Sequence, residues 1–304
     1  MGLVLGLLLF PVPASAAFWN VAVPLLPLLF IVNVELWRNV CPLATLNAVA
    51  GEGNVARTLS KDAIHLATIA GISTLLVSIP ARRLVLNDDG VATGVVLAAF
   101  AVMALASGFR FQNKAGFCNS VCPILPVERL YGTRPLAVVE NARCTPCRAC
   151  TRSGCIDLGT ERSVLQVLGE ARNTRAWVLT PFALFALSFP GVITGFYLVP
   201  GLPADSAFGV YATIALFGGV SWAGLAAVFT LGRPAPPNAL FWTAGLSASL
   251  YYWFTPAAIS EAFGLPPLAA PLMRGVAFAL IALWVLRAAR HRGAQPLTLG
   301  PRAS

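Results

Sequence analysis

Four of the seven cysteines lie within twelve residues, in the stretch ARCTPCRACTRSGCID, with the spacing Cys144-x₂-Cys147-x₂-Cys150-x₄-Cys155. Three thiolates at two-residue gaps can bind three irons of a four-iron cluster, and the fourth iron then needs a thiolate from elsewhere. Structural zinc usually uses two separate C-x₂-C pairs or adds histidines, and no histidine is near this run. The pattern therefore favours an iron–sulfur cluster over zinc.

The missing thiolate has two candidates, Cys41 and Cys122, because each is followed by proline. They belong to an internal repeat, in which LWRNVCPL and FCNSVCPI lie 81 residues apart and Trp37 matches Cys118. The second copy thus reads C-x₃-C-P, whereas the first has a tryptophan in place of one cysteine. Internal repeats usually mark repeated structural units, so we expect each copy to be the end of a membrane helix followed by a ligand loop.

The number of cysteines bears on the number of clusters. Two full four-iron clusters need eight thiolates, and the chain has seven cysteines. We expect one cluster to take the first three cysteines of the run and one Cys-Pro cysteine. Cys118, Cys155 and the other Cys-Pro cysteine would remain for a second cluster, because the fourth cysteine of such a run can serve another cluster. That second cluster would have three irons, or four with a non-cysteine ligand such as Asp157. We favour two [4Fe-4S]-type clusters over one.

The elements that carry these cysteines are expected to be membrane helices. The chain has 304 residues, of which 57% are hydrophobic and 11% charged, with a mean hydropathy of +0.75. A soluble domain carries about a quarter charged residues. A membrane helix needs about 20 mostly apolar residues. Seven segments meet or approach this requirement: 18–37, 63–80, 90–108, 177–199, 207–231, 239–259 and 268–286.

The predicted fold is therefore an all-α membrane helix bundle of seven transmembrane helices, or eight, with a small cytoplasmic ferredoxin-like iron–sulfur head. Residues 1–17 lack the positive n-region of a signal peptide, so an eighth short membrane segment or an interfacial stretch is favoured over cleavage. We divide the chain into residues 1–109, with the first Cys-Pro loop, the iron–sulfur region 110–175, and a four-helix membrane region with a basic tail, 176–304.

The distribution of basic residues predicts the orientation. Residues 110–175 carry ten basic and five acidic residues, and the C-terminal tail is also basic. Lys and Arg mark cytoplasmic loops, so the C-terminus and all seven cysteines should lie on the cytoplasmic side of a bacterial inner membrane. Thiols stay reduced there, which disfavours disulfides.

Several polar residues are candidates for further roles. Arg143, Arg148 and Arg152 interleave with the cysteine run, where they would dock an acidic carrier or simply follow the topology rule. His65 and Asp62, near the cytoplasmic end of the second predicted helix, are the candidate proton-handling pair for a quinone, although an interfacial position alone explains them equally well. The chain has only two histidines, which argues against a multi-haem cytochrome b.

The stretches LWRNVCPLA and CNSVCPILPVERLYG, together with the later cysteine run, resemble a known family over residues 36–157. They look like the membrane-bound polyferredoxins of the NapH, NosR and CcoG type, and most like the small FesM-like membrane iron–sulfur proteins. The resemblance implies [4Fe-4S] clusters that relay electrons at the membrane, often in exchange with quinol. It departs from the larger relatives in having one cysteine loop where they have two.

These observations predict an electron-transfer protein that relays electrons between a soluble ferredoxin-like carrier and the quinone pool, or a membrane redox complex. No catalytic residue and no nucleic-acid partner is indicated. Because a surface cluster cannot reach across about 30 Å of hydrocarbon, we expect electrons to stay on the cytoplasmic side unless a quinone or partner takes them onward. Two alternatives remain: an accessory or maturation subunit that supplies electrons for assembly of another metalloenzyme, and a transporter-like protein with a structural metal site.

Overall fold

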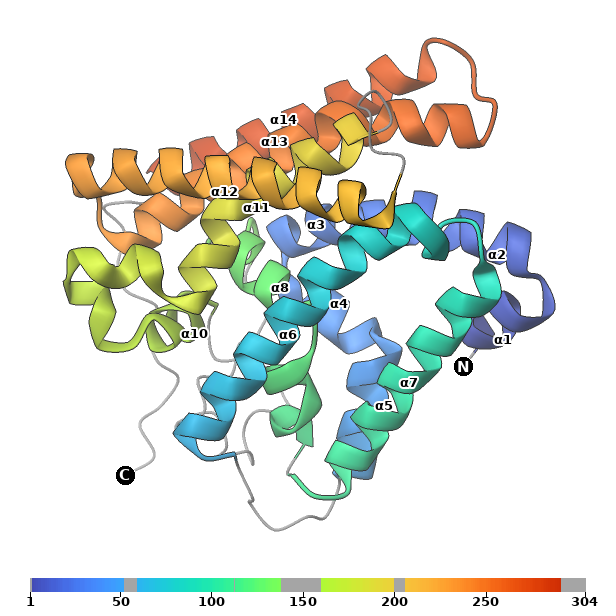
Figure 1. Ribbon diagram of the computed structural model, residues 1–304, viewed down its shortest axis with the longest axis horizontal. Coiled ribbons are helices and arrows are strands. Elements are labelled where there is room, and N and C mark those ends of the chain that lie inside the picture. Colours follow the sequence, from blue (N-terminus) through green and yellow to red (C-terminus); the bar gives the residue numbers. More distant parts are fainter. Residues whose placement is uncertain (1, 52–58, 112, 138–159, 200–205, 291–304) are drawn as a thin grey trace.

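The computed structural model describes residues 2–51, 59–111, 113–137, 160–199 and 206–290, and in these residues it contains helices and no strands (Figure 1). Six of the described helical segments are long and apolar enough to cross a membrane: Pro11–Val32, Asp62–Leu86, Gly90–Gly108, Pro181–Leu198, Ala207–Gly232 and Ala269–Arg290. The chain is thus an all-helical, multi-pass membrane protein whose apolar helices fit a lipid bilayer. The expected ferredoxin-like head is not shown, because its cysteine run lies outside the described residues.

The first membrane segment differs from its predicted bounds of 18–37. It consists of α2 (Pro11–Ala17), the π-helical turn η1 (Phe18–Ala22) and α3 (Val23–Val32), and it ends at Asn33. Asn33 has extended backbone angles, and its side chain accepts a hydrogen bond of 2.6 Å from the Glu35 backbone N–H. An asparagine in this role caps a new helix, so α4 (Val34–Val40) starts in a new direction. The preceding helix α1 (Gly2–Leu9) is too short to span a bilayer.

The remaining predicted segments correspond to single long helices. They are α6 (Lys61–Ala81) with η2 (Arg82–Leu86), α7 (Gly90–Gly108), α11 (Pro181–Leu198), α12 (Ala207–Gly232), α13 (Pro236–Ala262) and α14 (Ala269–Arg290). With 27 residues α13 is long enough to span a bilayer, but its Ser, Thr, Tyr and Trp residues make it less apolar than the six segments above. It packs between α11 and α14, where ten of its residues are buried.

The long helices form two layers around a set of short ones (Figure 1). Helices α12, α13 and α14 lie at the top of the view, where α11 packs against α12 and α13, and α13 packs against α14; α6 and α7 cross below them at an angle. A central set of short helices lies below the top helices and beside α6 and α7: α4, α5 (Pro42–Ala50), η4 (Phe117–Val121) and α8 (Leu125–Tyr131). The two Cys-Pro sequences are in this central set.

The helices in the described part of the region 110–175 are all short. Besides η4 and α8 these are η3 (Asn113–Ala115), α10 (Thr160–Leu168), η7 (Gly169–Asn173) and η8 (Arg175–Leu179). Helix α10 packs on α8, and Arg129 Nε donates a hydrogen bond of 3.0 Å to Ser163 Oγ across this contact. The helices on either side of residues 138–159 are therefore attached to the central set.

Candidate functional site

The two Cys-Pro sequences have the same local structure. Cys41 ends α4 with φ −63° and ψ 120°, and Cys122 ends η4 with φ −57° and ψ 123°. A proline disfavours helical angles in the residue before it, so each cysteine leaves the helix. Pro42 then begins α5, and Leu125 begins α8 shortly after Pro123. The repeat found in the sequence is thus a repeat of helix, Cys-Pro turn and helix.

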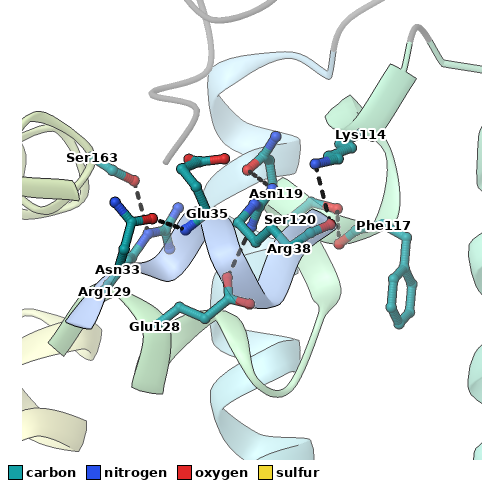
Figure 2. A network of polar contacts seen from close by, with 10 residues as sticks. All are labelled: Asn33, Glu35, Arg38, Lys114, Phe117, Asn119, Ser120, Glu128, Arg129 and Ser163. Carbon is teal, nitrogen blue, oxygen red and sulfur yellow. Dashed lines mark hydrogen bonds and ion pairs between the residues drawn. The ribbon is translucent and has the colours of Figure 1, made fainter. Parts of the chain in front are cut away.

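The two copies also contact one another through equivalent residues. Arg38 in the first copy aligns with Asn119 in the second, 81 positions later. Arg38 Nη2 donates a hydrogen bond of 3.0 Å to Asn119 Oδ1 (Figure 2). Two similar units that face each other make contact through equivalent positions, so this bond indicates that the two copies face each other. Arg38 Nη1 also forms an ion pair of 2.8 Å with Glu128 Oε2 on α8.

Three of the seven predicted ligand cysteines are brought together by this arrangement. Cys118 and Cys122 are buried, with exposed fractions of 5% and 9%, and Cys41 is half-buried. None of the three forms a disulfide, and they lie close enough for a charge on one to affect the others. Within the described residues, no three Cys, His, Asp or Glu side chains are close enough together to hold one metal ion. Cys144, Cys147, Cys150 and Cys155 lie outside the described residues, as do Asp157, Arg143, Arg148 and Arg152.

Burial keeps these thiols protonated in the absence of a bound cation. It raises the pKa of Cys122 to about 12, and it holds the pKa of Cys118 well above its usual range. Smaller electrostatic effects follow, because the positive charge of Arg38 lowers the pKa of Cys118 and the negative charge of Glu128 raises it. A metal that binds these sulfurs must displace their protons, as thiolate sites generally require.

The turns lie beside the middle of the long helices, not at their ends as the sequence led us to expect. Gly71 is midway along α6, and a Cβ atom there would lie 3.0 Å from the Val121 carbonyl oxygen and 3.2 Å from that of Cys122. Helix α5 runs along α7, with its Ala50 end beside Gly108. The Cys41 end of α5 is therefore about 12 Å further along α7, at 1.5 Å per residue. The chain turns back into the bundle because the first membrane segment ends at Asn33.

A cavity of about 330 Å³ extends from the two turns between α3, α6, α7 and α11. Cys41 and Cys122 line it with apolar side chains such as Val96 and Phe100, and Trp19 and Arg82 line it as well. The Arg82 guanidinium lies 4.7 Å from the centre of the Trp19 ring and donates a hydrogen bond of 3.3 Å to the Trp19 carbonyl. Ligand-sized pockets of this kind are mostly apolar with a few polar groups.

One buried polar group in the cavity wall makes no hydrogen bond of normal geometry. The Tyr251 hydroxyl is buried and makes no hydrogen bond within the described residues, although Arg82 and Thr255 are its polar neighbours. Sequence reasoning missed Arg82, Tyr251 and the buried pair Arg38–Glu128. Only Arg38 had a signal in the sequence, because the repeat aligns it with Asn119.

The proposed quinone pair is elsewhere. His65 and Asp62 are both exposed near the start of α6, where Ser60 caps the helix by accepting a hydrogen bond of 3.2 Å from the Ala63 backbone N–H. Neither residue lines the cavity. Comparison with known proteins adds no assignment, since no family model, no curated protein and no solved structure matches this chain.

Proposed function

We propose that this protein is a membrane-bound electron carrier that binds iron–sulfur clusters at its Cys-Pro turns and its cysteine-rich loop. The observation that carries the proposal is the convergence of Cys41, Cys118 and Cys122 from two copies of one motif. Packing alone does not require cysteine at these positions, because an aliphatic side chain would fill a buried apolar site as well. The sequence adds the C-x₂-C-x₂-C run, which is typical of such clusters.

The described residues include the type of side chain that such a cofactor needs. Thiolates are the usual ligands of iron–sulfur clusters, and a bound cluster supplies a one-electron carrier at this place in the fold. Cys41, Cys118 and Cys122 would share the binding of two clusters with thiolates of the run Cys144–Cys155, with one Cys-Pro cysteine at each cluster. The buried Arg38 contributes positive charge, which offsets some of the negative charge that thiolates and sulfide bring.

The electrons would pass between a soluble ferredoxin-like carrier on the cytoplasmic side of a bacterial inner membrane and a membrane partner. The cavity beside Cys41 and Cys122 supports a quinone as that partner, because it offers an isoprenoid quinone an apolar space next to the turns. The chain's own contribution there is to exclude water and to present the Tyr251 hydroxyl and the Arg82 guanidinium to carbonyl oxygens. Basic residues near the cysteine run would attract the acidic carrier.

The first test is metal and sulfide analysis of anaerobically purified, cofactor-replete protein, with EPR after dithionite reduction. Iron, sulfide and a reducible cluster signal are expected, and Cys122→Ser should lower all three. About four irons per chain, with Cys118→Ser harmless, would contradict two clusters. Colourless protein without reducible iron would overturn the proposal.

A second test concerns the cavity. Val96→Trp fills it from α7, whereas Val95→Trp places the same ring on the neighbouring residue, which is exposed. We expect both variants to keep their iron and only Val96→Trp to lose reduction of a short-chain quinone in proteoliposomes. Equal quinone reduction by the two variants would place the quinone outside the cavity.

A further inference from the structure

The ion pair between Arg38 and Glu128 is fully enclosed in protein. The exposed fraction of each residue is 3%, and the donor and acceptor atoms are 2.8 Å apart. Removing two charges from water is expensive, and replacing such a pair by apolar residues of similar size is often neutral or stabilising. Fold stability alone is therefore a weak reason to have a buried ion pair here.

The position of the pair suggests another reason. Arg38 comes three residues before Cys41, Asn119 directly follows Cys118, and Glu128 lies on α8, the helix after the Cys122 turn. One guanidinium thus bonds to the segment before the second turn and to the helix after it (Figure 2). Lys114 Nζ adds a hydrogen bond of 3.4 Å to the Arg38 carbonyl oxygen. We call Arg38, Asn119 and Glu128 the clamp, because they join the two copies.

The clamp also acts electrostatically on the cysteines. Arg38 lies three residues before Cys41 and is hydrogen-bonded to the residue that follows Cys118, and Glu128 carries a negative charge 2.8 Å from the Arg38 guanidinium. Reduction of a cluster adds one electron and therefore one negative charge. Nearby positive charge stabilises the reduced form and raises the reduction potential, whereas nearby negative charge lowers it.

We propose that Arg38 is a positioning residue, which holds the two Cys-Pro turns in the relative position that cluster binding requires. The Arg38–Glu128 pair also sets the reduction potential of a cluster bound at these turns. This inference rests on the proposed function. It assigns distinct effects to the two partners: loss of Arg38 removes both the link to Asn119 and a positive charge, whereas loss of the Glu128 charge leaves that link in place.

The test is a redox titration followed by EPR on the full-length protein. Arg38→Gln should shift the midpoint potential of one cluster to a more negative value, and Glu128→Gln should shift the same signal to a more positive value. Arg162→Gln, which removes an exposed arginine on α10, is the control and should leave the potential unchanged. Shifts of the same sign, or no shift, for the two clamp variants would overturn the electrostatic role.

Positioning is tested with Arg38→Met/Glu128→Leu, which removes both charges and fills the same space. We expect thermal unfolding like that of the native protein but a lower iron content, because the bond to Asn119 is lost. Full iron content in this double variant would overturn the positioning role. Native protein without iron would instead overturn the proposed function and this inference with it, so the two failures are distinguishable.

Discussion

At the scale of single residues, the two copies of the repeat are alike in backbone but have diverged in side chains. Cys41 and Cys122 have nearly the same backbone angles, yet Trp37 stands where the second copy has Cys118. The ring of Trp37 lies 6.4 Å from that of Phe30 and lines the cavity. One copy thus supplies a second thiol and the other supplies a wall of the cavity, so the site is asymmetric although its framework is repeated.

Two neighbouring tyrosines allow a test of the unpartnered hydroxyl. Tyr251→Phe removes a buried hydroxyl that has no hydrogen bond, so the variant should unfold at a higher temperature, with a gain of about 1–3 kcal/mol. Tyr252→Phe removes a hydroxyl that donates a hydrogen bond of 2.5 Å to the Pro24 carbonyl, so it should lose about 1 kcal/mol. Differential scanning calorimetry of the ligand-free protein measures both.

If the Tyr251 hydroxyl contacts a ligand, the more stable variant should also bind a short-chain quinone more weakly. Equal melting temperatures for Tyr251→Phe and the native protein would show that this hydroxyl has a partner in solution.

At the scale of elements, close packing of helices depends on glycine at several positions, among them Gly191 and Gly71. A Cβ atom at Gly191 of α11 would lie 2.0 Å from the Phe217 carbonyl oxygen on α12. A Cβ atom at Gly71 would press on the turn that carries Cys122. Small residues let helix backbones approach closely in membranes. The first glycine joins two membrane helices, and the second allows the Cys-Pro turn to lie against α6.

Gly191→Ala should therefore separate α11 from α12 and lower the melting temperature, because the obstructing atom belongs to the backbone and cannot rotate away. The matched control is Gly219→Ala on α12, where an added Cβ meets nothing within 4 Å. Alanine favours helix by about 1 kcal/mol over glycine, so the control should be neutral or slightly stabilised. A control variant that melts as early as Gly191→Ala would contradict the packing argument.

At the scale of the whole molecule, the positions of the turns change the expected path of the electrons. The sequence suggested clusters at the cytoplasmic ends of membrane helices, yet Cys122 lies beside the middle of α6. A cluster bound there would lie beside the middle of a long helix and not at its cytoplasmic end. The cavity then continues along α6 and α7 to Arg82, beyond the other end of α6. A partner within the membrane is therefore better placed than the sequence alone implied.

Cysteine labelling can test this depth. In cluster-free proteoliposomes of single-cysteine variants, a membrane-impermeant maleimide added to either face should leave Cys118 and Cys122 unmodified. A small permeant maleimide should modify the half-buried Cys41 faster than the buried Cys118. Mass spectrometry of the intact protein gives both rates. Rapid modification of Cys122 by the impermeant reagent from one face would place the turn at the membrane surface.

Several features followed from the sequence because they depend on local composition and spacing. Runs of apolar residues predict membrane helices whatever the tertiary fold. The repeat predicted a common turn at Cys41 and Cys122 because proline restricts the backbone angles of the residue before it. The predicted end of the first membrane segment, at residue 37, was wrong because the prediction relied on apolar composition. The stretch is mostly apolar up to Trp37 and the helix nevertheless ends at Asn33, because the Asn33 side chain caps a new helix.

The tertiary structure decided which residues meet. Arg38 and Asn119 are 81 positions apart, and Trp19 and Arg82 are 63 apart, so no local pattern places either pair together. The cavity is built from apolar residues of many helices, any of which could equally have faced lipid. Burial of the Arg38–Glu128 pair and the depth of the Cys-Pro turns depend in the same way on how the helices pack. The sequence by itself predicts that the cysteines are ligands, and packing determined the environment in which three of them lie.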